Sequence, residues 1–243
     1  MKTIIGNIYN TVEKILYKIE LKKVKKRNKL PLINIKSKER AIDLLLEEYL
    51  EKVLDRDIFS RSGGGFLDKQ NENIFKDHLQ DKIKKIDNEE EEYLIKILNK
   101  RISKWFVPLY LNEVDSFSER LMKELIEAGI KVVDPSYNKY FLYAAQKKYK
   151  SKTNDYLIER FKKSNLNVKR GIFRLFYWAP LDKESEEYTD RLSMLLNEYS
   201  KTSNRKLKNY ISRKVPKEIG DYPQKIKIEA ERYLRIKENT PSA

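Results

Sequence analysis

Glycine and proline are scarce in this chain, and their scarcity limits what it can fold into. Only 7 Gly and 7 Pro occur among its 243 residues, so the sequence contains few obligatory turns. Leu, Ile, Lys and Glu are abundant instead, a composition that favours helices. Hydrophobic residues make up 40% of the chain, which is enough for a sizeable core. The composition therefore predicts a globular, mainly α-helical fold.

The first 29 residues have the pattern of a basic amphipathic helix. Nine basic and two acidic residues lie between positions 1 and 30, and the run KKVKKRNK ends the segment. Its apolar residues recur at helical spacing on one face: Ile5, Ile8, Val12, Ile15, Leu16 and Ile19. Such a face most often docks on the rest of a domain, and we expect it to do so here. An arm that binds nucleic acid and a helix that lies on a membrane surface are the alternatives.

Helical periodicity continues along most of the chain. Capping patterns at Asn88 with Glu91 and at Ser116 with Glu119 mark the starts of two helices. Gly129 marks the end of the second. The predicted helices cover residues 37–57, 68–86, 88–111, 116–129, 155–164, 183–199, 204–213 and 223–238.

The periodicity changes around residues 130–178, where β-branched and aromatic residues are dense. The run IKVVD at 130–134 is β-branched and ends before Pro135, which is typical of a strand. YNKYFLYAA at 137–145 could pair back against it, and NVKRGIFRLFYW at 167–178 also has strand character. We therefore predict a small β element here, between a bundle-like N-terminal helical unit and further C-terminal helices.

Composition also divides the chain lengthwise. From residue 31 to residue 130 the basic and acidic residues nearly balance, whereas the later part is basic. The predicted organisation is an N-terminal helix over 1–29, a helical domain over 30–134, and a basic domain over 135–243. The last of these would contain the β element and the C-terminal helices.

The overall charge is the strongest indication of a partner. The chain has 52 Lys+Arg against 37 Asp+Glu, which gives a net charge of +15 and a pI near 9.5. Such a field attracts polyanions, with nucleic acid as the first candidate and an anionic membrane as the second. A low-GC genome or a hot habitat could also make a chain rich in lysine, but a hot habitat would raise the number of acidic residues as well. The large basic excess therefore favours a polyanionic partner.

Basic and aromatic residues are interleaved between residues 139 and 178. This window holds eleven basic residues against Asp155 and Glu159, together with ten aromatic residues. Phosphates need cations and unpaired bases stack on flat rings, so the segment suits single-stranded nucleic acid. RKLKNYISRKVPK at 205–217 adds a second basic stripe without acidic residues. The predicted nucleic-acid-binding residues are Lys147, Lys148, Tyr149, Lys150, Lys152, Tyr156, Lys162, Lys163, Lys169, Arg170, Arg174, Arg205, Lys206, Lys208, Arg213 and Lys214.

These features favour a non-catalytic nucleic-acid-binding protein. It would be a subunit of a replication, processing or viral nucleoprotein assembly, and its helical faces would bind protein partners. A helical protein–protein scaffold is an alternative that needs no nucleic acid. The N-terminal segment lacks the apolar run of a signal peptide or a membrane span, so an intracellular, cytoplasmic protein is expected.

A metal-dependent nuclease with a restriction-enzyme-like fold is a sharper alternative. Such enzymes combine carboxylates that hold Mg²⁺ with a lysine that orients water. In this chain the matching order is Glu124 or Glu127, then Asp134 at the predicted strand end, then Gln146 and Lys148. Gln146 stands where a carboxylate is more usual, so catalysis is not the preferred function. Outside this alternative we predict no catalytic residues, no metal and no cofactor.

Composition excludes several other kinds of chemistry. Without cysteine the chain has no disulfides, thiolate metal sites or cysteine nucleophiles. The single histidine, His78, lies among apolar residues and is expected to be structural. The FSRSGGGF segment at 59–66 lacks the Gly-Lys-Ser/Thr of a phosphate-binding loop.

One family resemblance concerns residues 41–128. There a helix and a break are followed by FLDKQNENIFKDHL, an acidic turn, EEYLIKILNKRISKWF and a capped helix. This order resembles the helical domain of archaeal GINS replication subunits. The resemblance implies a replication scaffold subunit as a further alternative. The part of the chain beyond residue 135 does not match the small β-domain of that family.

Overall fold

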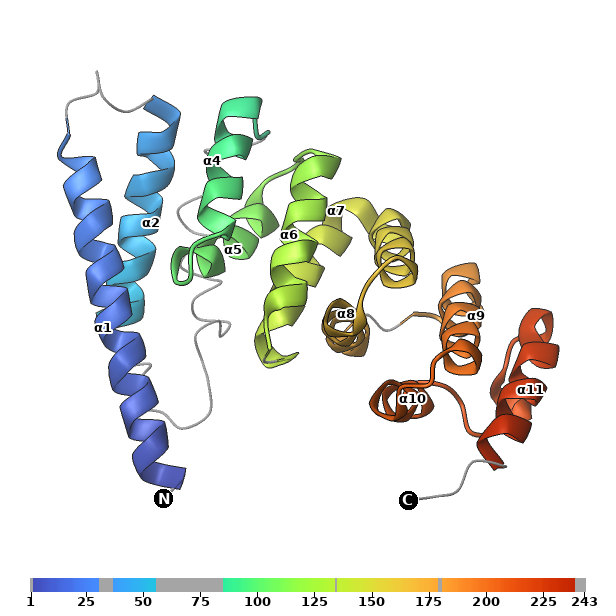
Figure 1. The fold of residues 1–243 in the computed structure, drawn as a ribbon. Helices are drawn as coiled ribbons and strands as arrows, with labels where there is room; N and C mark the ends of the chain where they lie inside the picture. The colour runs from blue at the N-terminus through green and yellow to red at the C-terminus, as the bar shows by residue number, and fades with distance from the viewer. Residues whose placement is uncertain (1, 31–36, 56–84, 134, 179–180, 239–243) are drawn as a thin grey trace. The chain divides into compact units, whose positions relative to one another are not determined.

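The computed structural model describes residues 2–30, 37–55, 85–133, 135–178 and 181–238, most of which are helical (Figure 1). Within those ranges no β-strand forms, and an isolated β-bridge joins Lys85 to Ser116. The fold is therefore mainly α, as the scarcity of turn residues predicts. His78, the 59–66 segment, Asp134 and all but the last two residues of the predicted 68–86 helix lie outside the described residues.

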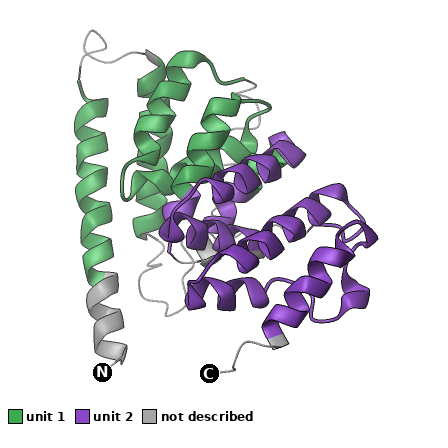
Figure 2. Ribbon diagram, turned by 45° about the vertical axis from the view of Figure 1, so that its right-hand side comes forward, with its two compact units in different colours: residues 1–128, 143–148 green, residues 129–142, 149–243 purple. Residues whose placement is uncertain are grey.

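The chain forms two compact units, which Figure 2 shows in different colours. Unit 1 comprises Met1–Ala128 and Tyr143–Lys148, and unit 2 comprises Gly129–Leu142 and Tyr149–Ala243. Each unit has its own set of buried apolar side chains.

Unit 1 consists of helices packed around large apolar side chains. Its elements are α1 (Lys2–Asn28), α2 (Ser37–Asp55), α4 (Asn88–Leu98), the 3₁₀ turn η3 (Ser103–Trp105), α5 (Phe106–Glu113) and most of α6 (Glu119–Lys131). Helix α1 lies along α2, and α4 also contacts α2 (Figure 1). The core contains Phe106, whose ring centroid is 6.0 Å from that of Tyr49 and 5.4 Å from that of Tyr110.

The predicted helix over 88–111 is two helices, α4 and α5, joined through η3. The Asp87 carboxylate caps α4 by accepting hydrogen bonds from the backbone N–H groups of Glu89 and Glu90. The Glu90 side chain accepts the Asp87 N–H in return, at 3.0 Å. The capping box therefore starts one residue before Asn88. Asp and Asn are equally good caps, so the sequence alone does not separate the two registers.

Helix α6 also differs from its predicted limits. Its first residue is Glu119, and the Ser118 hydroxyl accepts the Leu121 N–H at 3.0 Å, so Ser118 rather than Ser116 is the capping residue. The helix then continues past Gly129 to Lys131.

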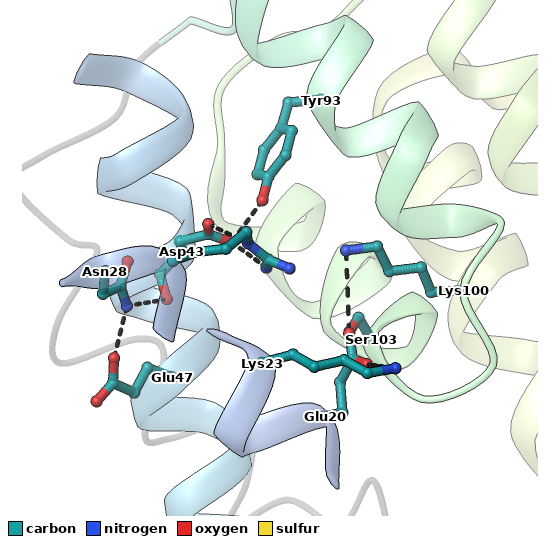
Figure 3. Close-up of polar contacts among 9 residues, drawn as sticks. Glu20, Lys23, Asn28, Asp43, Glu47, Tyr93, Lys100 and Ser103 are labelled. Carbon is teal, nitrogen blue, oxygen red and sulfur yellow. Dashed lines mark hydrogen bonds and ion pairs between the residues drawn. The ribbon is translucent and has the colours of Figure 1, made fainter. Parts of the chain in front are cut away.

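A buried carboxylate fixes α1 to α2 and α4 (Figure 3). Asp43 is 1% exposed and accepts hydrogen bonds from Arg27 Nε and Nη2 at 2.8 and 2.7 Å, and from the Tyr93 hydroxyl at 2.5 Å. The bond to Asp43 raises the pKa of the Arg27 guanidinium, whereas burial is the main cause of the raised pKa of Tyr93. Earlier in α1, Glu20 accepts a hydrogen bond from the Ser103 hydroxyl at 2.7 Å. One face of α1 is thus held by charged and polar contacts.

Unit 2 consists of helices packed around an aromatic core. Its elements are α7 (Pro135–Lys162, of which residues 143–148 belong to unit 1), α8 (Leu166–Trp178), α9 (Glu186–Lys201), α10 (Arg205–Ser212), the 3₁₀ turns η4 (Ile219–Asp221) and η5 (Gln224–Ile226), and α11 (Lys227–Glu238). The rings of Phe161 and Phe173 meet edge to face with centroids 5.3 Å apart. Tyr199 and Tyr233 do the same at 4.7 Å, which joins α9 to α11.

Helix α7 is interrupted at Lys150, where φ is 38° and ψ is −115°. A positive φ brings the Cβ atom close to the backbone, so it is unfavourable for every residue except glycine. The interruption divides α7 into two helical segments that do not share one continuous helical face.

The β element predicted around 130–178 is wrong. The described residues of that region form the end of α6, α7, α8 and the short turns between them. In α8 the buried side chains are Ile172, Phe173, Leu175 and Phe176, a spacing that matches one face of a helix. Packing of that face outweighs the strand preference of its β-branched and aromatic residues.

Candidate nucleic-acid interface

Helices α8 and α10 bring the two basic segments of the sequence together inside unit 2 (Figure 1). The Tyr210 ring of α10 stacks on Phe173 of α8, with centroids 6.2 Å apart. The Arg170 guanidinium lies 5.7 Å from the centroid of the same Tyr210 ring. Arg170 and Tyr210 are separated by 40 positions in the sequence, so the fold creates a contact that the linear pattern does not contain.

Helix α10 presents an exposed basic face. Leu207 and Ile211 bury its opposite face in the unit 2 core. Lys206 is four residues before Tyr210 and Arg213 is three residues after it, spacings that place all three on one side of the helix. All three are exposed. This face therefore combines two cations with an accessible aromatic ring.

Arg174 is the fixed member of the group on α8. Its Nε and Nη2 atoms donate hydrogen bonds to the backbone carbonyls of Val132 and Ile130, at 3.1 and 3.2 Å. Burial lowers the pKa of Arg174, and the neighbouring positive charge of Arg170 lowers it further. Arg170 and Arg174 are one helical turn apart, so α8 carries two guanidinium groups on one face.

The close approach of α8 to Ile130 depends on glycine. A Cβ atom at Gly171 would lie 2.4 Å from the Ile130 carbonyl oxygen and 2.6 Å from Ile130 Cγ2. No side chain fits in that space, so Gly171 allows the approach that places Arg174 against the carbonyl groups. We define the α8–α10 basic cluster as Arg170, Arg174, Lys206, Tyr210 and Arg213.

Other predicted cations of unit 2 have partners in their own unit. Lys163 pairs with Glu159 one turn earlier in α7. Lys169 Nζ lies 2.6 Å from Glu198 Oε1 and 5.2 Å from the Phe161 ring centroid. Lys208 lies 5.1 Å from the Tyr199 ring centroid, on the side of α10 that faces α9. The Lys169–Glu198 pair is shielded from water, whereas the Lys163–Glu159 pair is exposed and weaker.

The remaining predicted cations of unit 2 are exposed: Lys150, Lys152, Lys162, Arg205 and Lys214. Partial burial lowers the pKa of Lys214. Lys162 lies at the rim of a groove of about 780 Å³ between α7 and α9. The acidic residues that line this groove are Asp155, Glu159, Asp190 and Glu198. Lys162 thus borders an acidic surface, unlike the residues of the α8–α10 basic cluster.

Lys147 and Lys148 belong to unit 1. Lys147 Nζ donates a hydrogen bond to the Asn112 backbone carbonyl at 2.6 Å, at the C-terminal end of α5, where a cation is favourable. Burial and the neighbouring Lys147 lower the pKa of Lys148, and the carboxylates of Asp115 and Glu113 act in the opposite direction. These lysines therefore have local electrostatic partners in unit 1.

The aromatic residues most exposed near cations are not those that the sequence predicts. Tyr149 and Tyr156 are half-buried and make contacts within the protein. Tyr210 is not among the binding residues predicted from the sequence, but it is 37% exposed and lies in the α8–α10 basic cluster. A helical projection of RKLKNYISRK could have identified it, because Leu207 and Ile211 fix the buried face and leave Tyr210 outside it.

The residues of the nuclease alternative are only partly described. Glu124 is exposed on α6, whereas Gln146 and Lys148 are half-buried on α7. Asp134 lies outside the described residues. Among the described side chains there is no group of three or more Asp, Glu, His or Cys residues arranged to hold a metal ion.

No protein-family model matches the chain, and neither a curated protein nor a solved structure similar to it was found. Of the helices in the described ranges, none combines the length and the apolar character needed to cross a bilayer.

Proposed function

We propose that this chain binds nucleic acid through the α8–α10 basic cluster, as a binding subunit rather than an enzyme. The observation that carries the proposal is the contact of Arg170 with Tyr210, which joins two basic helices around an exposed ring. Within the described part of the chain, no carboxylate pairs with Arg170, Lys206 or Arg213. Their charge is therefore available to an external polyanion.

Phosphate groups would contact the guanidinium and ammonium groups of the cluster. Neutralising phosphates releases condensed counterions, so such binding weakens steeply as salt rises. Arg213 and Lys206 are exposed and can move toward a ligand, whereas Arg174 is held by backbone carbonyls. We therefore assign phosphate contact to the exposed residues and a supporting role to Arg174.

An unpaired base would stack on the Tyr210 ring. Base–aromatic stacking contributes about 1–3 kcal/mol per base and is available only when the base is not already stacked in a duplex. The proposed ligand is therefore single-stranded nucleic acid, with duplex as the weaker alternative.

The proposal is tested by titrating the full chain into fluorescently labelled single-stranded and duplex oligonucleotides at increasing salt, with and without Mg²⁺. We expect tighter binding to the single strand, a steep loss of affinity with salt, and intact oligonucleotides throughout. Binding that is absent or insensitive to salt would contradict the proposal. Cleavage that requires Mg²⁺ would replace it with the nuclease alternative.

The role of Tyr210 is tested in the same titration. Tyr210→Leu should weaken binding to the single strand about tenfold, whereas Tyr210→Phe should bind like the original chain. Tyr143→Leu is the matched control, because Tyr143 is also an exposed tyrosine (43%) but belongs to unit 1. Equal losses for the Tyr210 and Tyr143 variants would show that no stacking site exists at α10.

A further inference from the structure

Helix α1 exposes part of the apolar face that its sequence predicts to be buried; the side chains of Ile5 and Ile8 lie outside the described ones, and Leu16 is half-buried. Val12, Ile15 and Ile19 are 45%, 50% and 44% exposed. The side that docks on unit 1 instead contains Tyr17 and Val24, which are 1% and 0% exposed. Docking of α1 is therefore observed, but through a different face. The exposed apolar side chains lie one turn apart and form a continuous strip along the helix.

This orientation of α1 is fixed by polar contacts on its inner side. Arg27 makes two hydrogen bonds to the buried Asp43, and Glu20 accepts one from Ser103. Glu13 is 8% exposed and pairs with Arg101. Rotating α1 to bury the apolar strip would break all of these contacts. The strip is therefore unavailable to the core of unit 1.

The exposed face of α1 is cationic as well as apolar. Lys18, Lys22 and Lys26 are exposed and follow the strip along the same side of the helix. The acidic residues of this helix, Glu13 and Glu20, are the ones that point inward. Across residues 11–30, the outer face thus carries lysines and aliphatic side chains without a carboxylate.

The shape and charge of this face decide between possible occupants. A second copy of α1 would place lysines against lysines, which is unfavourable. Nucleic acid would engage the lysines but not the aliphatic strip. Helix α1 lies at the margin of unit 1 with α2 on one side (Figures 1 and 2), so its outer side is open to a flat surface.

We propose that the outer face of α1 binds the surface of an anionic lipid bilayer. The helix lies in the plane of the interface with Val12, Ile15 and Ile19 among the acyl chains. Lys18, Lys22 and Lys26 reach the phosphate groups, while their methylene chains remain beside the apolar strip. The contact is peripheral, and the rest of unit 1 stays in water on the opposite side of α1.

The test is co-sedimentation of the full chain with vesicles of phosphatidylcholine alone or of phosphatidylcholine mixed with phosphatidylglycerol. We expect binding to the mixed vesicles only. Ile15→Ser together with Ile19→Ser should reduce that binding at least about tenfold, because both residues insert. Lys22→Gln with Lys26→Gln should reduce it mainly at low salt.

Ile228→Ser is the matched control, since Ile228 is 76% exposed but lies on α11 in unit 2. It should leave vesicle binding unchanged. Equal binding to both vesicle types, or no loss in the Ile15 and Ile19 variant, would overturn the proposal. The proposal would also be overturned if the chain self-associates without lipid and the Ile15 and Ile19 variant does not. The outer face of α1 would then bind a second copy of the chain. Circular dichroism checks that each variant remains folded.

Discussion

The two units differ in the group that accepts hydrogen bonds from an inward-pointing arginine. In unit 1, Arg27 donates two hydrogen bonds to the Asp43 carboxylate, so the cation forms an ion pair with an anion. In unit 2, Arg191 is 8% exposed and donates to the neutral Asn154 amide oxygen at 2.8 and 3.2 Å, with its guanidinium 4.4 Å from the Phe176 ring centroid. Burial lowers the pKa of Arg191. Unit 1 thus pairs a partly exposed arginine with a buried carboxylate, whereas in unit 2 a buried arginine donates to a neutral amide oxygen and lies against an aromatic ring.

The same difference extends to the surface. Most ion pairs among the described residues lie in unit 1, for example Lys25 with Glu51 and Arg101 with Glu13. In unit 2 the Arg170 guanidinium contacts a ring and Arg174 contacts carbonyl groups. The net charge of a chain therefore does not locate a polyanion site. On the proposed function, a polyanion would bind where cations lack carboxylate partners.

The largest effect is expected from removing the unit 1 carboxylate. Asp43→Ala would leave the Arg27 guanidinium and the Tyr93 hydroxyl without their shared acceptor. Removing one partner of such a contact costs about 3 kcal/mol. We therefore expect Asp43→Ala to lower the free energy of unfolding by that amount, as measured by urea denaturation. Glu51→Gln, which removes an exposed partner of Lys25, should cost less than about 1 kcal/mol. Similar losses of unfolding free energy for the two variants would mean that unit 1 does not depend on the Arg27–Asp43 pair.

A smaller effect is expected where unit 2 supports its cluster. Gly171→Ala places a methyl group 2.4 Å from the Ile130 carbonyl, and overpacking outweighs the better helix propensity of alanine. We expect a loss of about 2 kcal/mol in unfolding free energy, together with weaker oligonucleotide binding. Gly220→Ala is the control, since a Cβ there meets nothing within 4 Å. A neutral Gly171→Ala would show that α8 can move away from Ile130 freely.

The smallest effect concerns the interruption of α7. Lys150→Gly relieves the positive φ of 38° and should raise the unfolding free energy by about 1 kcal/mol, the usual strain of such a conformation. Lys150→Ala removes the same charge but keeps a Cβ, so it should give no gain. A comparison of the two by thermal unfolding separates backbone strain from charge. Equal stabilities would indicate that Lys150 is not strained.

The helical character of the fold was predictable, because few turn residues and repeated apolar spacing are local properties. The starts of α4 and α6 were predictable to within one or two residues, since several capping residues occur close together at Asp87 and at Ser118. The prediction of a β element is wrong for a different reason. Ile172, Phe173 and Phe176 prefer strands in isolation, and only their burial in unit 2 favours the helix.

The sequence predicts that the candidate site is basic and aromatic, but it does not predict which residues form it. The sequence identified Arg170 and Arg213 from the basic stripes. It did not foresee that Lys169 would pair with Glu198, because the two residues lie on different helices. Nor did it select Tyr210, which becomes important only when α10 packs on α8. The exposed face of α1 was missed because its docking is decided by polar contacts such as Arg27 with Asp43.

The most direct test compares charge removal in the two units by the salt dependence of oligonucleotide binding. Lys206→Gln with Arg213→Gln removes two charges from the α8–α10 basic cluster, and Lys25→Gln with Lys96→Gln removes two from carboxylate-paired positions of unit 1. We predict that the slope of log affinity against log salt falls by roughly 1.5 for the first variant and stays unchanged for the second. Equal slopes for both variants would contradict the account.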